Sequence, residues 1–408
     1  MTLLSCTLLT LAIWALAVQV LGQLAVFWLV RKPSLKCATP SSGVTVLKPL
    51  KGADPNLEQN LRSVFEQDWH QFELVFGAED PFDPALAVVH RLAREYPHIP
   101  CRVVTSPKPL GLNPKVRLCA ELARHARFDL VLISDASVFA PPGYLRAMVD
   151  SYARPNTGLV SSPLVGFGET TPGGSVDNLI LNLFILRAVC FTKLFIRHSC
   201  VIGKSMMFRL SELNRLGGWQ SVRDVLAEDY VLGRLFRRAG FEVRLCPLRL
   251  PTRTHCSAVG DSLRRHVRWC QMRRRTSMMA YLAELLANAT LWAGALIGVA
   301  SFSDSASVPT EEGSAQAFVM AGLIILGAKL LLDVGSMVWL SPGGTYRRAL
   351  RWLLIADVLN VWIWLQGAVR RRVEWRGTQL LIGDGTRLTL YDRAESTDSV
   401  RHYSAANS

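Results

Sequence analysis

The chain has 408 residues, half of them hydrophobic, with 46 Lys and Arg against 32 Asp and Glu and a formal net charge of +14. A basic balance can indicate a nucleic acid, an anionic membrane surface or an anionic substrate as partner. The sequence has no zinc-finger spacing, no RNP-like aromatic pattern and no basic helix with a heptad repeat, which disfavours nucleic acid. Its nine cysteines are odd in number and include no C-x-x-C pair, which argues against a disulfide framework and a zinc site.

The first apolar segment covers residues 3–30 and is long enough to cross a hydrocarbon core of about 30 Å. It shows neither the basic n-region nor the small-residue cleavage site of a signal peptide. Arg31, Lys32 and Lys36 follow directly, so the positive-inside rule places the N-terminus outside and the following residues in the cytoplasm. We predict a transmembrane anchor over residues 1–32.

Residues 44–150 alternate strand and helix patterns. The predicted strands contain "GVTVLKPL", "FELVFGAED", "CRVVTS" and "FDLVLIS", and segments with helical spacing separate them. This alternation predicts βαβ units and a mainly parallel sheet, whose ligands bind outside the carboxyl ends of the strands. Asp80 and Asp135 stand at two such ends. We expect a cytoplasmic α/β domain over residues 40–278.

Residues 176–197 are apolar but contain Arg187, Lys193 and Arg197. Because of these basic residues the segment would be a poor transmembrane span, so we predict an amphipathic helix in the membrane interface. Such a helix would seat the α/β domain against the bilayer.

Three further apolar stretches, 285–302, 316–340 and 350–368, predict C-terminal membrane helices within residues 279–370. The first loop between them contains the acidic residues Asp304, Glu311 and Glu312, and the second contains the basic residues Arg347, Arg348 and Arg351. By the positive-inside rule the first loop lies outside and the second in the cytoplasm. We expect a polar tail over residues 371–408.

Charged residues within these stretches need partners. Lys329 and Asp333 are four residues apart on a predicted helix, so we expect a mutually neutralising pair that faces the other helices. The third stretch contains Asp357 and Asn360 and ends in the three arginines 370–372. It either spans the membrane against the positive-inside rule or is a re-entrant or interfacial segment.

Four features could carry chemistry: Asp80 in "GAEDP", Asp135 in "SDAS", Asp229 in "LAEDYVLG", and the run "RRHVRW" at 264–269. Each has an ordinary structural explanation. An acidic residue after a strand commonly caps a helix or a turn, and Glu228 with Asp229 could simply begin a helix. Arginine and tryptophan near a membrane segment commonly anchor it at the interface. The combination is more informative than any single member.

Over roughly residues 44–290 this combination resembles the family-2-type inverting glycosyltransferases, and most closely their ceramide glucosyltransferase branch. The blocks that carry the resemblance are "LKPLKGADPNL", "EDPFDPA", "GLNPKV", "SDAS", "AEDY" and "RHVRW", the last being an R-x-x-RW signature. Bacterial hopanoid-associated N-acetylglucosaminyltransferases are similar in every block. The resemblance implies a GT-A fold, which is Rossmann-like with a mainly parallel sheet, together with N-terminal and C-terminal transmembrane helices.

The resemblance also implies roles for the acidic residues. Asp135 would be the metal-proximal aspartate, and Ser137 replaces the second carboxylate of a D-x-D motif, so we expect a weakly held Mg²⁺ or Mn²⁺ ion that arrives with the nucleotide. Asp80 would contact the uracil and ribose of the donor. Asp229 would be the general base that takes the proton of the acceptor hydroxyl.

Further residues are assigned by the same resemblance. The expected donor-binding residues are Lys48, Lys51, Lys115, Arg265 and Arg268, where a guanidinium suits a diphosphate. The expected acceptor-binding residues are Trp269, Cys200 and Gly203. For Cys200 and Gly203 a packed turn that leads into a strand is an equally good interpretation.

The sequence therefore predicts a multi-pass membrane enzyme, in a bacterial inner membrane, that moves a hexose from a UDP-sugar to a lipid hydroxyl at the cytoplasmic face. UDP-glucose and ceramide are the first choice, and N-acetylglucosamine transfer to a hopanoid is the alternative. A non-catalytic membrane protein with a decayed transferase domain is disfavoured because Asp229 and the Arg268–Trp269 pair are intact. The expected partners are the donor, the lipid and the membrane, without nucleic acid.

Overall fold

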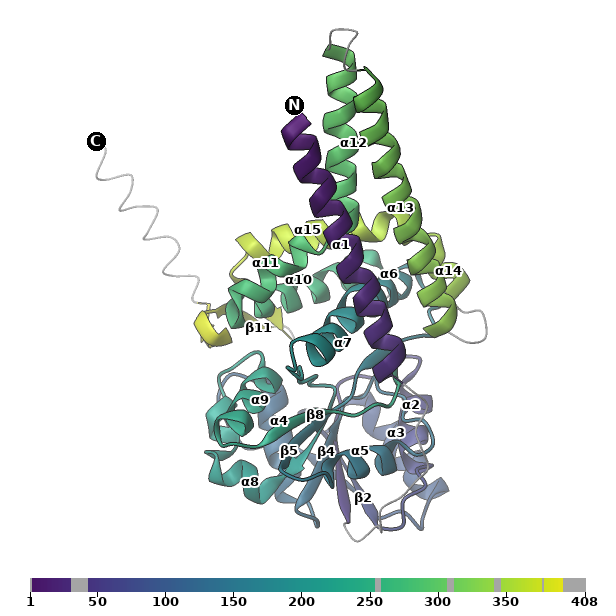
Figure 1. Ribbon diagram of the computed structural model, residues 1–408. Coiled ribbons are helices and arrows are strands. Elements are labelled where there is room, and N and C mark those ends of the chain that lie inside the picture. Colours follow the sequence, from purple (N-terminus) through teal and green to yellow (C-terminus); the bar gives the residue numbers. More distant parts are fainter. Residues whose placement is uncertain are drawn as a thin grey trace, which may run out of the picture.

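The computed structural model describes residues 2–30, 43–253, 258–306, 312–340, 346–375 and 378–391. Figure 1 shows an α/β domain, then a layer of crosswise helices, then an upright bundle of helices. Arg31, Lys32 and Lys36, on which the predicted orientation depends, lie outside the described residues, and so does Glu311. The α/β domain and the apolar helices near both chain ends confirm the expected fold class.

The centre of the α/β domain is a seven-stranded sheet with the order β3-β2-β1-β4-β7-β5-β8. Its strands are β1 (Val44–Pro49), β2 (Phe72–Ala78), β3 (Cys101–Thr105), β4 (Leu130–Ser134), β5 (Thr157–Ser161), β7 (Ser205–Arg209) and β8 (Glu242–Leu245). All neighbours pair in parallel except β7, which runs antiparallel to both β4 and β5. The first residue of β7, Ser205, therefore lies beside Ser134 at the carboxyl end of β4.

Helices cover both faces of the sheet, and alternate strand residues bury an apolar core on each face. One face carries α2 (Leu57–Phe65), α3 (Pro84–Glu95) and α5 (Tyr144–Tyr152), and the other carries α4 (Pro114–Arg124), α8 (Leu210–Arg215) and α9 (Glu228–Arg238). The starts of α3 and α4 follow from sequence, because Asp83 and Asn113 accept first-turn amide hydrogen bonds and a proline follows each. A separate parallel pair joins β6 (Leu164–Gly166) and β9 (Leu250–Thr252).

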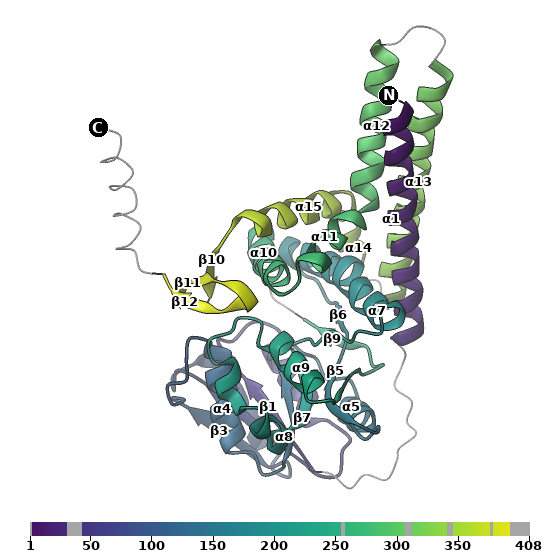
Figure 2. The same cartoon turned by 60° about the vertical axis from the view of Figure 1, so that its left-hand side comes forward.

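The middle layer contains helices that run across the direction of the bundle (Figure 1). They are α6 (Pro172–Ile180), a π-helical turn (Leu181–Ile185), α7 (Leu186–Phe195), α10 (Val259–Thr276), α11 (Met278–Leu286), α14 (Tyr346–Leu350) and α15 (Leu353–Val369). The helix predicted for the membrane interface corresponds to α6 and α7. The stretch 350–368 corresponds largely to α15, which packs along α10 instead of joining the bundle, as Figure 2 also shows.

The upright bundle consists of α1 (Thr2–Leu29), α12 (Ala289–Ala306) and α13 (Glu312–Leu340), which contact one another pairwise. Three helices of the described residues are long and apolar enough to cross a membrane: Leu3–Leu29, Pro172–Phe195 and Ser314–Leu340. A fourth candidate is the pair α11 and α12, which is bent by 51° at its break.

Four buried charges connect this bundle to the crosswise helices. Lys329 Nζ lies 2.6 Å from Asp333 Oδ2, which confirms the predicted pair within α13. Arg187 Nη1 of α7 lies 2.6 Å from Asp333 Oδ1, and Lys329 also pairs with Asp357 of α15. Two cations and two carboxylates thus form a neutral cluster, and Lys329 is the partner that Asp357 needs in an apolar helix.

Residues 371–391 form part of the expected polar tail, but the structure shows a small antiparallel sheet, here called the C-terminal lobe. Its strands are β10 (Arg372–Trp375), β11 (Thr378–Ile382) and β12 (Leu388–Leu390). The expectation is wrong here because the strands bury one apolar face against Leu226 of the α/β domain. The residues on that face are Val373, Leu380, Ile382 and Leu388. Residues 392–408, the rest of the expected tail, lie outside the described residues.

Candidate active site

Asp229 stands in the first turn of α9, where backbone amides fix both of its carboxylate oxygens. Oδ2 accepts a hydrogen bond from the Gly203 amide and Oδ1 accepts one from the Tyr230 amide, each at 2.7 Å. Burial, and then the charge of Glu228, raise the pKa of Asp229 to about 6, while Lys115 opposes this shift. The result is an oriented carboxylate that is more basic than an ordinary aspartate, as a general base near neutral pH requires.

Lys115, in the first turn of α4, connects the acidic residues of the site. Its Nζ lies 3.0 Å from Glu228 Oε1 and 3.2 Å from Asp135 Oδ1, and it donates to the Gly203 carbonyl at 2.8 Å. Burial disfavours the charge of this ammonium, but the carboxylates of Asp135 and Glu228 outweigh it and raise the pKa of Lys115. Lys115 therefore stays charged beside the candidate base.

Gly203 lies between Lys115 and Asp229, just before β7. A Cβ added here would lie 2.9 Å from Asp229 Oδ2 and 3.2 Å from Lys115 Nζ. The backbone of Gly203 can thus hydrogen-bond to both Asp229 and Lys115 only because this residue has no side chain. The sequence predicts Gly203 near the acceptor or in a packed turn, and the structure places it against the candidate base.

Asp135 directly follows β4, as expected for a ligand-binding carboxylate of a parallel sheet. Its Oδ1 is buried and accepts no hydrogen bond from the described residues, although it lies within ion-pair distance of Lys115. The third residue of the D-x-S motif, Ser137, accepts a hydrogen bond from Lys204 Nζ at 3.0 Å. Lys204 also donates to Thr252 Oγ1 at 3.1 Å, so an ammonium group already lies beside Ser137.

A single carboxylate suits a divalent ion that is held mainly by the ligand it accompanies. Among the described residues there is no group of three or more His, Cys, Asp or Glu side chains that could hold a metal ion by itself. The donor set at Asp135 therefore fits a weakly held ion and does not fit a permanent metal centre.

Two of the predicted donor-binding residues, Lys48 and Lys51, lie in and just after β1. Lys48 is fully buried within the strand, and its Nζ donates to the Asp135 carbonyl at 3.0 Å and to Ser134 Oγ at 3.1 Å. Burial lowers the pKa of Lys48 to about 7, against the opposing charge of Asp135. Lys48 thus supports the Asp135 loop from inside the sheet, whereas Lys51 is exposed beyond the strand.

Asp80 is exposed in the turn after β2, where its Oδ1 accepts the Phe82 amide at 2.9 Å. The neighbouring Asp83 accepts the Gly52 amide at 3.0 Å and 2.9 Å, which joins the loops after β1 and β2. Asp80 therefore has the turn-forming role that the sequence also allowed, and contact with the uracil and ribose stays a prediction.

The R-x-x-RW signature lies on α10, where its first arginine binds another helix. Arg265 Nη1 donates to both oxygens of Asp177 on α6, at 3.1 Å and 2.9 Å, and His266 Nε2 lies 2.9 Å from the same carboxylate. His266 packs edge-on against Trp269 with ring centroids 5.1 Å apart. Asp177 is not among the predicted site residues, although an acidic residue inside an apolar helix signals a buried partner.

The remaining signature residues stand at the boundary of the α/β core. Arg268 and Trp269 are both partly buried, and Trp269 packs against the core cluster that also contacts Ile202. Cys200 Sγ lies 3.4 Å from Thr192 Oγ1, and burial raises the pKa of its thiol, so the thiol stays protonated. Contacts of Trp269 and Cys200 with an acceptor stay predictions.

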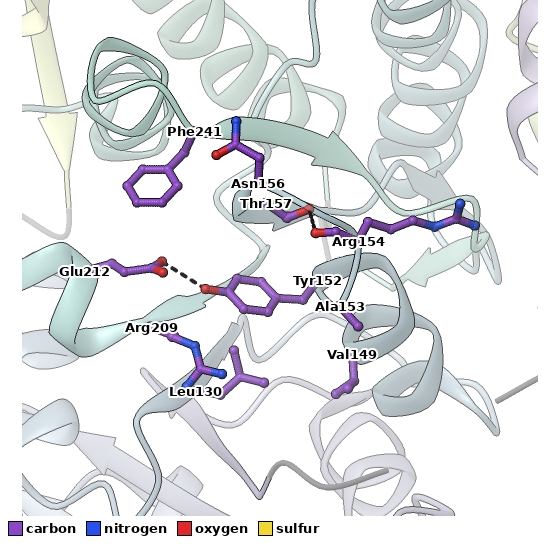
Figure 3. Close-up of a pocket in the computed structure, with 10 residues that line it drawn as sticks. All are labelled: Leu130, Val149, Tyr152, Ala153, Arg154, Asn156, Thr157, Arg209, Glu212 and Phe241. Carbon is purple, nitrogen blue, oxygen red and sulfur yellow. Dashed lines mark hydrogen bonds between the residues drawn. The ribbon is translucent and has the colours of Figure 1, made fainter. Parts of the chain in front are cut away.

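The hollow in Figure 3 has a volume of about 450 Å³ and lies at the opposite edge of the sheet. Leu130, which lines it, begins β4, whereas Asp135 follows the end of that strand. Tyr152 and Glu212 are hydrogen-bonded to each other at 2.9 Å in its wall. None of the predicted site residues lines this hollow.

The fold is that of the GT-A glycosyltransferases, with the candidate base, Lys115 and Asp135 gathered at the carboxyl end of β4. A similar solved structure is the mannosyltransferase PcManGT from Pyrobaculum calidifontis, in complex with GDP-Man and Mn²⁺, with a TM-score of 0.52 and 21% identity over 88% of this chain and 99% of that one. More particularly, this chain belongs to glycosyl transferase family 21, whose sequence model matches residues 5–388.

Curated relatives of this chain are ceramide glucosyltransferases. Ceramide glucosyltransferase 1 of Caenorhabditis elegans is 29% identical over 242 residues, which cover 59% of this chain and 51% of the relative. The Komagataella phaffii enzyme is 29% identical over 231 residues, covering 50% and 45%. The Pyricularia oryzae enzyme is 26% identical over 340 residues, covering 67% of each. The matched part of this chain thus spans about half the length of the first two relatives.

Proposed function

We propose that this protein transfers a hexose from a UDP-sugar to the hydroxyl of a membrane lipid, with glucose and ceramide as the preferred pair. The observation that carries the proposal is the setting of Asp229, which two amides orient and whose pKa is raised to about 6. The similarity to ceramide glucosyltransferases supports the choice of glucose and ceramide.

In the proposed reaction Asp229 accepts the proton of the acceptor hydroxyl while that oxygen attacks the anomeric carbon of the donor. The bond from the anomeric carbon to the diphosphate breaks, and UDP leaves with the electron pair. One base on the face opposite the leaving group gives inversion of the anomeric centre. A base with a pKa of about 6 is largely ionised at neutral pH and is still basic enough to take the proton.

Positive charge near the leaving diphosphate comes from the residues around Asp135. Lys115 is held by Gly203, Asp135 and Glu228 and so presents a fixed ammonium at this edge of the sheet. Arg268 of the signature is proposed to contact the diphosphate, for which a guanidinium has the right shape. The Asp135 carboxylate would hold a Mg²⁺ or Mn²⁺ ion that arrives with the nucleotide, and such an ion would neutralise part of the phosphate charge.

The lipid acceptor is supported by the layer of crosswise helices above the site. α11 and α15 carry apolar side chains that are largely exposed, namely Met279, Leu354 and Val358. Exposed apolar side chains on helices next to a membrane bundle suit the interfacial region of a bilayer. We propose a multi-pass protein of the bacterial inner membrane, with the α/β domain at the cytoplasmic face and residues 172–195 in the interface.

The test is transfer by the purified, detergent-solubilised full chain. UDP-glucose and UDP-N-acetylglucosamine are offered separately, each with ceramide and with a polyol hopanoid, and the lipid products are identified by mass spectrometry. Glucosylated ceramide with an inverted anomeric centre is the expected product. An N-acetylglucosaminylated hopanoid would replace the proposed substrates, and a product with retained configuration would contradict Asp229 as a base for direct displacement.

A further inference from the structure

The C-terminal lobe contacts the chain segment that leads into Asp229. The Leu226 amide donates to the Thr386 carbonyl at 2.9 Å, and the Ala227 amide donates to Thr386 Oγ1 at 3.1 Å. These two donors immediately precede Glu228 and Asp229. Thr386 thus binds the two residues next to the acidic pair with both its backbone and its side chain.

Neighbouring residues of the lobe extend this contact into a short antiparallel pairing. Val225 and Arg387 form an isolated antiparallel bridge, and the Leu388 amide donates to the Asp224 carbonyl at 2.7 Å. Leu226 is buried among the apolar side chains of the lobe. The segment 224–227 is therefore fixed along its length by residues 386–388.

The conformation of Thr386 singles this residue out within the lobe. It is fully buried and has a φ of +62°, a left-handed conformation that is unfavourable for a β-branched residue. Glycine or asparagine would adopt it more easily, but glycine has no side-chain oxygen for the Ala227 amide. Ala227 is the N-cap residue of α9 and has no capping side chain of its own. A strained residue that supplies a bond to this cap indicates a functional constraint.

The lobe is also attached to the helix of the R-x-x-RW signature. Gln271 is buried on α10, two residues beyond Trp269, and its Nε2 donates to the carbonyls of Arg370 and Arg372 at 3.1 Å and 3.2 Å. Arg275 of the same helix lies 2.9 Å from Asp384 in the lobe. Figure 2 shows the lobe beside the end of α10. The lobe therefore connects the signature helix to the segment that carries the base.

We propose that Thr386 is a positioning residue for Asp229, and that the C-terminal lobe sets the placement of the base relative to the signature helix. This inference rests on the proposed function, in which Asp229 is the base. Without the bond to Thr386 Oγ1 the Ala227 amide at the start of α9 would no longer be held in place, and Asp229 could shift. Small displacements of a catalytic group strongly reduce the rate of the chemical step.

The test compares Thr386→Val, which keeps the branched shape and removes the oxygen, with Thr386→Ser, which keeps the oxygen. Thr389→Val is the matched control, because Thr389 is exposed on β12. We expect Thr386→Val to lower kcat about tenfold or more while the KM for the donor changes less than about twofold. Thr386→Ser should restore most of kcat, and Thr389→Val should resemble the unmodified protein. Thr386→Gly removes the same oxygen but relieves the backbone strain. It should therefore fold normally and still show the same loss of kcat as Thr386→Val.

Hydrogen–deuterium exchange supplies a readout that does not depend on turnover. Peptides covering residues 224–230 should exchange faster in Thr386→Val than in the control, while UDP affinity stays unchanged. Normal kcat and normal exchange in both Thr386→Val and Thr386→Gly would overturn the inference. Asp229→Asn is measured in parallel: an active Asp229→Asn protein would refute the proposed base, whereas the exchange experiment would still decide whether Thr386 holds the segment.

Discussion

Lys115 and Asp135 form an ion pair of 3.2 Å at the carboxyl end of β4. The ammonium thus occupies one side of the carboxylate that is proposed to meet a divalent ion. Because Lys115 also binds Gly203 and Glu228, it can stay in place when Asp135 turns toward another cation.

We therefore predict two opposite effects of Lys115→Met. Transfer should fall about a hundredfold, because a fixed positive charge near the leaving diphosphate is lost. The affinity of the nucleotide-free protein for Mn²⁺ should rise, because the competing ammonium has left Asp135. Steady-state kinetics and Mn²⁺ titration by electron paramagnetic resonance measure the two effects. Lys108→Met changes an exposed lysine and serves as the control. Unchanged Mn²⁺ affinity would show that the ion does not use Asp135.

Gly203→Ala should nearly abolish transfer. The added methyl group would lie 2.9 Å from Asp229 Oδ2, so the carboxylate or the backbone of Gly203 must move. Gly294→Ala is the matched control, because its added Cβ would meet no atom within 4 Å. We expect a kcat at least about a hundredfold lower for Gly203→Ala at similar thermal stability. A Gly203→Ala enzyme with normal kcat would show that the contact between Gly203 and Asp229 is dispensable.

The activity should depend on pH through Asp229. Its pKa is raised to about 6, so the carboxylate takes up a proton as the pH falls through this value, and the base is lost. We expect kcat/KM to be level above about pH 7 and to fall about tenfold per pH unit well below pH 6. In Glu228→Gln the acid limb should move to lower pH, because the charge of Glu228 contributes to the raised pKa. An acid limb at the same pH in both proteins would contradict this assignment.

The buried charge cluster predicts a stability pattern. Lys329→Met should destabilise the protein by about 3 kcal/mol, because it leaves the buried carboxylate of Asp357 without a cation. The double variant with Asp357→Asn should recover much of this loss, because Arg187 and Asp333 then remain as a neutral pair. Heating each variant in detergent, followed by size-exclusion chromatography, gives the midpoint temperature of its thermal unfolding. A double variant less stable than Lys329→Met alone would show that Asp357 does not depend on Lys329.

Much of the α/β domain could be predicted because its signals are local. Apolar runs predict the strands, and segments with helical spacing predict the helices between them. The direction of β7 carries no such signal. Strand patterns are the same for both directions, so the sequence could not show that the beginning of β7, with Gly203 and Lys204 before it, reaches the carboxyl end of β4.

The partners of several site residues could not be predicted because they come from distant parts of the chain. Arg265 resembled a donor contact, but its carboxylate partner, Asp177, lies 88 residues earlier on α6. The C-terminal lobe has strands of three to five residues, too short for a clear alternating pattern, and it forms only where Leu226 completes its apolar face. Thr386 gives no sequence signal, since a left-handed conformation normally favours glycine.

The bond between Ala227 and Thr386 joins residues 159 positions apart. During synthesis the segment of Asp229 leaves the ribosome long before the lobe that fixes it. Between them the chain must produce α12, α13 and α15, which include the apolar helices of the bundle. A ribosome-bound chain that stops before residue 386 would thus have every residue of the acidic site and still lack the support of its base. Assembly of the helices in the lipid would precede the first turnover, and a partly inserted protein would not consume the sugar donor.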